Sequence, residues 1–199
     1  MHPYSIDSRE RKTVPFYLSA LAIALAWAFY SSMTALTINL PWWINAPSVL
    51  GFYEILFLLF ENYGWKIEVL RVIGGIRTPN ISGDWAGKIK SSFDSTEKDV
   101  TVKIAQTWTQ MEVCLKTDGS TSRSNGAFFA GTPPSGPTLT YQYQNDPLPG
   151  TVQSMQIHYG TTKVLLAGDK FEGDYYSGRG RQNNGEILLR KKIRSDKNK

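Results

Sequence analysis

The sequence has few of the residues that build disulfides, metal centres or nucleophilic sites. Its 199 residues include one cysteine, Cys114, and two histidines, His2 and His158. One cysteine cannot form a disulfide within the chain, and this set is too small for a Cys/His zinc site. The sequence also lacks a Gly-x-Ser-x-Gly elbow and a P-loop. We therefore expect no catalytic residues, no metal site and no cofactor.

Charge is missing from a long N-terminal stretch, because residues 13–53 contain no Asp, Glu, Lys or Arg. The first apolar run, Pro15–Leu40, exceeds the ~20 residues that span a bilayer. A cleaved signal peptide is the alternative, but its apolar region usually has ~7–15 residues. A second apolar run, Pro47–Tyr63, follows after a short connection rich in helix-breaking residues. We therefore predict an N-terminal hairpin of two transmembrane helices.

The charges that flank these two runs predict how the hairpin is oriented. Basic residues precede the first run and follow the second, and the connection between the runs has none. The positive-inside rule then places both termini in the cytoplasm. Glu54 lies in the middle of the second run, where a charge is costly. It is either a contact used for self-association in the membrane or a side chain that snorkels from a shallow helix. The basic residues that flank the runs are Arg9, Arg11, Lys12, Lys66, Arg71 and Arg77.

From Ile81 onward the hydrophobic period changes to two, as in Val100, Val102 and Ile104. Such alternation is typical of antiparallel strands with one apolar face, and turn signals such as Asp118-Gly119 separate the runs. About eight sequential strands remove their exposed edges by closing, so we expect an all-β domain that is a small closed antiparallel up-and-down β-barrel. The predicted strands are 85–92, 98–108, 111–117, 120–129, 138–145, 152–160, 163–167 with 170–177 as a hairpin, and 185–192. They number eight if 163–167 joins the strand before it, and nine otherwise.

These patterns divide the chain into four parts. Residues 1–64 form an N-terminal tail and the two helices. Residues 65–80 form an amphipathic linker with a short helix that ends at Gly74-Gly75. Residues 81–193 form the cytoplasmic barrel. The basic tail, 194–199, is either a solvated chain end or a segment attracted to anionic lipid headgroups.

The first strand of the barrel begins with Gly83-Asp84-Trp85, which resembles the G-x-W start of lipocalin-like barrels. In those barrels the tryptophan closes one end, so the resemblance implies that Trp85 is a structural plug. A basic side chain from a late strand can cover such a ring by a cation–π contact. We expect Arg190 to take this position.

The whole chain resembles a bacterial family of two-transmembrane, β-strand-rich effectors found beside CD-NTases in cyclic-oligonucleotide-based antiphage signalling (CBASS). The resemblance rests on the uncharged hairpin, on SGDWAGKI at the start of the barrel and on FEGDYYSGRGRQNNGEILLRK near its end. It implies an effector in the bacterial inner membrane whose barrel binds a cyclic dinucleotide made by a partner CD-NTase. Binding would drive self-association, and the helices would then disrupt the membrane and cause cell death.

A cyclic dinucleotide has two phosphates and two bases, so its site needs cations or N–H groups and flat rings. Arginines in polar or Gly-rich stretches are candidates for the phosphates, and aromatic residues in or next to the strands are candidates for the bases. Alternatively, the Gly-Arg-Gly-Arg segment is an exposed loop and the aromatic residues belong to the core. The candidates for ligand binding are Arg123, Arg179, Arg181, Trp108, Tyr141, Tyr143, Tyr175 and Tyr176.

Three other functions fit parts of the sequence. A membrane-tethered lipocalin-like barrel would bind a lipid or another apolar small molecule, which predicts a dry cavity that no basic group enters. An enzyme would need catalytic motifs that the sequence lacks. A purely structural protein would assemble without a ligand. Neither these functions nor the favoured one involves a DNA or RNA polymer as a partner.

Overall fold

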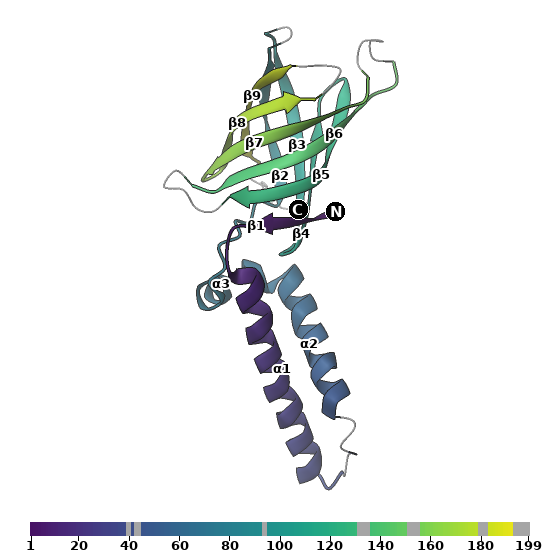
Figure 1. Ribbon diagram of the computed structural model, residues 1–199, viewed down its shortest axis with the longest axis vertical. Coiled ribbons are helices and arrows are strands. Elements are labelled where there is room, and N and C mark those ends of the chain that lie inside the picture. Colours follow the sequence, from purple (N-terminus) through teal and green to yellow (C-terminus); the bar gives the residue numbers. More distant parts are fainter. Residues whose placement is uncertain are drawn as a thin grey trace, which may run out of the picture. The chain divides into compact units, whose positions relative to one another are not determined.

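The computed structural model describes residues 1–38, 41, 45–92, 95–130, 136–150, 156–178 and 183–192. The chain folds into two compact units (Figure 1). One unit is helical and contains Ser8–Thr78. The other is a β-barrel that contains Met1–Asp7 and Pro79–Lys199. The N-terminal tail therefore folds with the barrel, whereas the sequence patterns grouped it with the helices.

The helical unit contains the two expected long helices, α1 (Glu10–Ala35) and α2 (Asn45–Asn62). Ala22 and Phe29 lie two turns apart on one face of α1, and the Phe29 ring is 6.1 Å from the Phe52 ring of α2. Small residues such as alanine let two helices approach closely. The two helices thus pack along each other as a hairpin.

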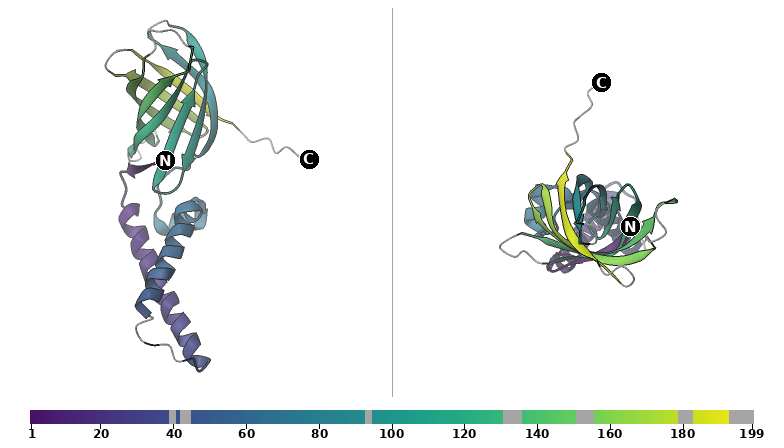
Figure 2. Two further views of the ribbon diagram at one scale, coloured as in Figure 1. Left: turned by 90° about the vertical axis from the view of Figure 1, so that its right-hand side faces the viewer. Right: turned by 90° about the horizontal axis from the view of Figure 1, so that it is seen from above.

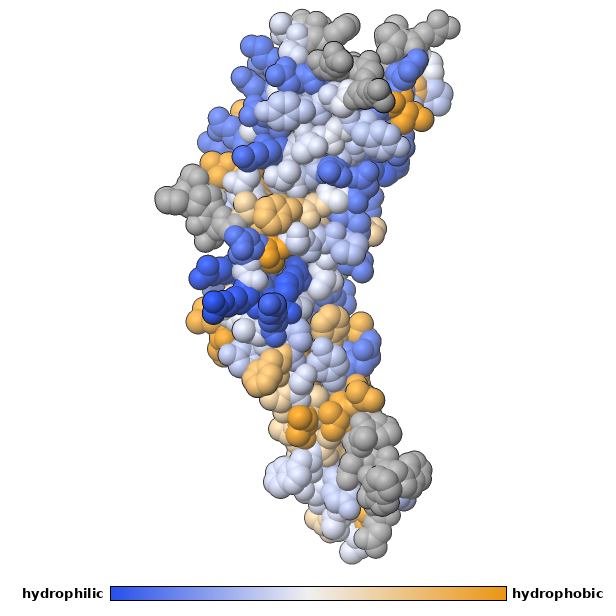
Figure 3. All heavy atoms as spheres, in the orientation of Figure 1, coloured by the Kyte–Doolittle hydropathy of each residue, from blue (hydrophilic) through white to orange (hydrophobic). Residues whose placement is uncertain are grey.

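The two units differ in the side chains that they expose (Figure 3). Large apolar side chains are exposed along both long helices, whereas most of the visible barrel surface is polar. Exposed apolar surface of this extent marks a contact with another apolar phase or partner. Among the described residues, α1 is the one helix that is both long and apolar enough to cross a membrane.

The linker after α2 contains a 3-10 turn, η2 (Gly64–Lys66), and a short helix, α3 (Glu68–Gly74). The helix ends at the predicted Gly-Gly pair. Gly75 takes the left-handed conformation (φ 60°), and its N–H caps the last turn.

A buried carboxylate ties the end of this linker to the start of α1. Glu10 accepts hydrogen bonds from the backbone N–H groups of Arg77 (2.5 Å) and Thr78 (3.1 Å), and from the Thr78 hydroxyl. Both Glu10 and Thr78 are fully buried. Two segments that lie 67 residues apart in the sequence are thus held together by one side chain.

The β unit is a closed barrel of nine strands (Figure 2). Strands β2 to β9 follow one another in antiparallel order, and β9 pairs with β2. The prediction of a small closed antiparallel barrel is therefore confirmed, with a ninth strand added. The strands are β1 (His2–Ile6), β2 (Gly83–Ser91), β3 (Glu97–Gln106), β4 (Gln110–Lys116), β5 (Ser120–Ala130), β6 (Thr138–Pro147), β7 (His158–Ala167), β8 (Lys170–Ser177) and β9 (Asn184–Lys191).

The additional strand, β1, fills a gap between β4 and β5. These two strands pair directly only near their turn, where Cys114 lies opposite Arg123. Farther along, β1 pairs antiparallel to β4 and parallel to β5, with Ser5 opposite Phe128. The Tyr4 side chain points inward and joins the buried core. The N-terminal tail thereby completes the barrel wall.

Alanine in place of Tyr4 should lower the stability of the barrel by about 3–5 kcal/mol, the usual cost of removing a large buried aromatic side chain. The Tyr4 ring packs edge to face on Phe129, with 5.7 Å between centroids, and its hydroxyl donates to the Trp108 carbonyl (2.7 Å). Pro3→Ala changes an exposed neighbour and should have little effect. Thermal unfolding of the full chain in detergent measures both variants. Equal melting temperatures would show that β1 does not stabilise the barrel.

Large side chains fill one end of the barrel. Trp85 lies there, almost fully buried, with its indole N–H donating to the Ile81 carbonyl (2.9 Å) and its ring 4.4 Å from the Phe171 ring. The cation over the Trp85 ring is Lys191, at 5.6 Å, and not the expected Arg190. Side chains alternate along β9, so Arg190 is exposed on the outer face.

Candidate ligand-binding site

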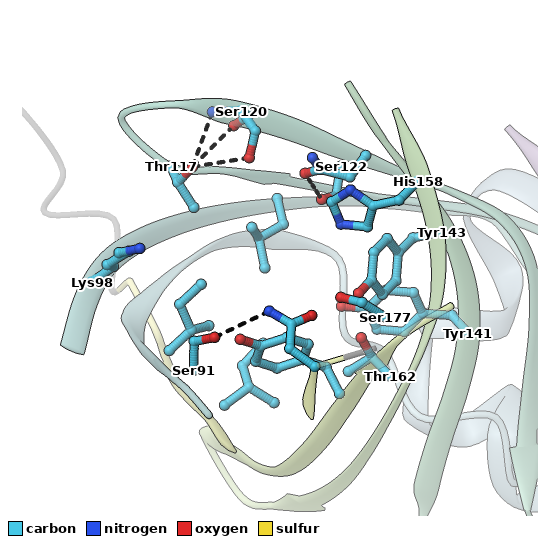
Figure 4. Close-up of a pocket in the computed structure, with 16 residues that line it drawn as sticks. Ser91, Lys98, Thr117, Ser120, Ser122, Tyr141, Tyr143, His158, Thr162 and Ser177 are labelled. Atoms are coloured by element: carbon cyan, nitrogen blue, oxygen red, sulfur yellow. Dashed lines mark hydrogen bonds between the residues drawn. The ribbon is translucent and has the colours of Figure 1, made fainter. Parts of the chain in front are cut away.

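The other half of the barrel contains a chamber that opens to solvent (Figure 4). The centre of a water-sized molecule can reach about 100 Å³ of it, and the empty space including the mouth is about 780 Å³. Ile89, Leu115 and Ile187 form an aliphatic part of the wall. Most other described lining residues carry hydroxyl, amide or aromatic groups. Such a wall suits a ligand that has flat apolar faces and polar edges.

Strand register places three polar side chains in one row of the wall. Ser122 on β5 lies opposite Asn145 on β6, which lies opposite His158 on β7. The Ser122 hydroxyl donates to Asn145 Oδ1 (2.8 Å), and His158 Nδ1 lies 3.0 Å from the Gln156 carbonyl oxygen. A carbonyl oxygen only accepts, so Nδ1 carries the proton of this hydrogen bond. In the neutral ring, Nε2 is then an acceptor.

Two tyrosines of β6, Tyr141 and Tyr143, form much of the aromatic wall. Both are buried, and their ring centroids lie 6.4 Å apart. Gly160 lies opposite Tyr143, and a Cβ at this position would be 2.3 Å from the Tyr143 ring, so only glycine fits. Burial raises the pKa of Tyr141 to about 12, and a hydrogen bond with Thr162 only partly opposes this shift. Tyr141 is therefore a neutral phenol at physiological pH.

The raised pKa of Tyr141 should make the barrel less stable in alkali. Its phenol ionises near pH 10 in the unfolded chain but only near pH 12 in the folded barrel. Below pH 10 this difference in pKa stabilises the folded barrel by about 2–3 kcal/mol. The contribution is lost as the pH rises to 12. The free energies of unfolding of the wild type and Tyr141→Phe, compared across this range, isolate the effect. Parallel pH profiles for the two proteins would contradict it.

The structure brings only some of the predicted ligand contacts to the chamber. Tyr141, Tyr143 and Tyr175 line it. Tyr176, next to Tyr175 in β8, is 53% exposed on the outer face, because side chains alternate along a strand. Arg123 also lies outside, exposed on β5 and 3.8 Å from a carboxylate of β6. These last two side chains do not reach the chamber.

Trp108 does not line the chamber either. It is buried in the turn between β3 and β4, where its carbonyl accepts the hydrogen bond from β1. Arg179 and Arg181 lie outside the described residues. Ser177 and Asn183, which come shortly before and directly after their segment in the sequence, both line the chamber.

The sequence patterns missed most of the polar wall. Among the described lining residues, Lys98 is the one Lys, Arg, Asp or Glu, and its side chain is exposed. One signal was available, because Asn145 continues the inward phase set by Leu139, Tyr141 and Tyr143. A polar residue on the apolar face of a strand indicates a polar cavity. The missed lining residues are Ser91, Thr117, Ser120, Ser122, Asn145, His158, Thr162, Ser177 and Asn183.

A closed β-barrel with a polar and aromatic chamber, joined to long apolar helices, defines a membrane-associated receptor for a small ligand. The chain belongs to the Cap15 family. Residues 76–191 match the family's cyclic dinucleotide receptor domain, and residues 12–66 match its TM helices. These matches confirm the resemblance to CBASS effectors.

Two relatives are similar to the chain over much of their length, and both are CD-NTase-associated protein 15. The protein from Yersinia aleksiciae is 28% identical over 193 residues, which cover 90% of this chain and 91% of the relative. The protein from Staphylococcus schleiferi is 26% identical over 133 residues, which cover 66% of this chain and 70% of the relative. The similarity to the Yersinia protein thus spans both the helices and the barrel.

Proposed function

We propose that this chain is a membrane effector of antiphage signalling, activated when its barrel binds a cyclic dinucleotide made by a CD-NTase. Binding drives self-association, and the helices then disrupt the inner membrane and cause cell death, without a catalytic step. One observation carries the proposal. The chamber lies within the residues that match a cyclic dinucleotide receptor domain, and its described wall combines aromatic rings with hydrogen-bonding groups.

The alternative function, binding of a lipid or another apolar molecule, is supported only by the aliphatic part of the wall. An apolar ligand would offer no partner to the Ser177 hydroxyl or to Asn183 Oδ1, which is buried without a hydrogen-bond partner among the described residues. Burying polar groups in this way is unfavourable. The polar lining thus favours the nucleotide.

Calorimetric titration of the full chain in detergent with a panel of cyclic dinucleotides tests the proposal. We expect saturable binding of at least one member of the panel. Mass spectrometry of small molecules that co-purify with the chain provides the second arm. A bound lipid, together with no measurable affinity for any cyclic dinucleotide, would overturn the proposal in favour of the apolar ligand.

Alanine at both Arg179 and Arg181 should weaken cyclic dinucleotide binding at least about tenfold, because each arginine is proposed to contact a phosphate and such charge-assisted hydrogen bonds contribute about 1.5–3 kcal/mol. The matched control is Arg123→Ala with Arg190→Ala. It removes the same charge from the exposed outer face and should bind like the wild type. Titration of both double variants measures the difference. Equal affinities would remove Arg179 and Arg181 from the site.

In the membrane, we propose that both long helices cross the bilayer and that both chain termini and the barrel are cytoplasmic. Glu54 supports a role for α2 in assembly, because its side chain is exposed on a helix whose other exposed side chains are mainly apolar. A carboxyl group in this setting gains from a polar partner on another helix. We place Glu54 at a contact between copies of the chain.

A further inference from the structure

The size of the chamber limits how much of a ligand can enter. The 100 Å³ that the centre of a water molecule can reach is several times the roughly 10–15 Å³ that a single water needs, so the interior has room for a small group such as one nucleobase. A cyclic dinucleotide contains two bases, two sugars and two phosphates. Most of it must therefore lie in the mouth, where the open space is much larger.

The charge of the wall decides which part enters. Lys98 is the one Lys, Arg, Asp or Glu among the described lining residues, and it is exposed. A phosphate moved deep among neutral hydroxyl and amide groups would lose hydration without gaining a counter-charge. A nucleobase is neutral and flat, and stacks well on tyrosine rings. The base therefore suits the interior, and the phosphates suit the mouth.

The described wall contains one buried acceptor without a donor and, on His158, a second acceptor that a base could use. Asn183 is 8% exposed, and its side-chain N–H group donates to the Ser91 hydroxyl (3.2 Å). Its Oδ1 atom is buried and has no hydrogen-bond partner among the described residues. His158 adds Nε2, which accepts when Nδ1 donates to the Gln156 carbonyl. A buried acceptor without a partner is unfavourable, so a ligand N–H group at this position is strongly favoured.

We infer that the chamber takes one nucleobase of the ligand, edge first, and that Asn183 Oδ1 and His158 Nε2 accept its N–H groups while the sugar–phosphate ring stays at the mouth. This inference rests on the proposed function, because it specifies how the same site recognises a cyclic dinucleotide. It makes Asn183 a specificity-determining residue. It also predicts that a free nucleoside is a weak ligand of the same chamber.

The test compares Asn183→Ala with its neighbour Asn184→Ala in the full chain in detergent. Asn184 is exposed, so the second variant controls for the loss of an asparagine side chain nearby. Titration with the cyclic dinucleotide panel and ligand-observed NMR with adenosine, guanosine, cytidine and uridine give the two readouts. Melting temperatures confirm that both variants are folded. We expect Asn183→Ala to lose about tenfold in affinity for both ligand types, and Asn184→Ala to match the wild type.

Each outcome separates the inference from the proposed function. If cyclic dinucleotides bind but Asn183→Ala does not weaken them, or if no nucleoside competes with them, the single-base arrangement is wrong and the receptor function stands. If nucleosides bind in an Asn183-dependent way but no cyclic dinucleotide does, base binding in the chamber is supported and the proposed function is wrong. If neither class of ligand binds the wild type, both are overturned.

Discussion

Phenylalanine in place of Ser177 should abolish ligand binding and leave the barrel folded. Ser177 lines the chamber at the end of β8, opposite Gly160, which the Tyr143 ring covers. A phenyl ring at this position would occupy much of the 100 Å³ that a ligand can reach. We expect a loss of affinity of at least about a hundredfold, equivalent to about 3 kcal/mol. Titration with the cyclic dinucleotide that binds the wild type measures it.

The matched control for Ser177→Phe is Thr161→Phe. Thr161 lies opposite the exposed Tyr176, so its side chain is on the outer face of the neighbouring strand. The same added ring there leaves the chamber open, and binding should stay within about twofold of the wild type. If Ser177→Phe binds as well as this control while both proteins melt like the wild type, the ligand does not use the chamber.

Most of the barrel could be predicted because its wall has one apolar face and one polar face. Val100, Val102 and Ile104 alternate with polar residues, and this period of two located the strands β2 to β9, although it divided β7 into two runs, 152–160 and 163–167. β1 could not be found in this way. It has five residues, includes Pro3, and is stabilised by its two neighbouring strands and by the burial of Tyr4, which its own sequence does not reveal.

The candidate site was predicted less completely, because residue type was given more weight than strand phase. Tyr175 is in phase with the buried Phe171 and lines the chamber, whereas Tyr176 is out of phase and faces outward. The same argument, applied to Arg123, would have placed it on the outer face. The amide of Asn183 was beyond such reasoning, because it lies just outside β9 and its partner, Ser91, belongs to a strand from the start of the barrel.

Alanine in place of Glu10 should uncouple the linker from α1 without changing the chamber. The Glu10 carboxylate is buried and accepts three hydrogen bonds from Arg77 and Thr78, so its removal leaves buried donors without partners. Each such donor costs about 1–3 kcal/mol, and we expect about 3 kcal/mol or more in total. Hydrogen exchange of the full chain in lipid nanodiscs should show faster exchange at Arg77, Thr78 and the first turn of α1.

The functional effect of Glu10→Ala follows from where the carboxylate lies. Glu10 is absent from the described lining of the chamber, so ligand affinity should match the wild type. Under the proposed function, the first turn of α1 and the linker that leads into β2 must move together if binding is to reach the helices. Ligand-induced leakage of dye-loaded liposomes should therefore fall steeply in Glu10→Ala, but not in Glu68→Ala, which removes an exposed carboxylate from α3. Leakage at the wild-type rate, with exchange at Thr78 accelerated, would show that this buried clamp stabilises the fold but does not transmit the signal.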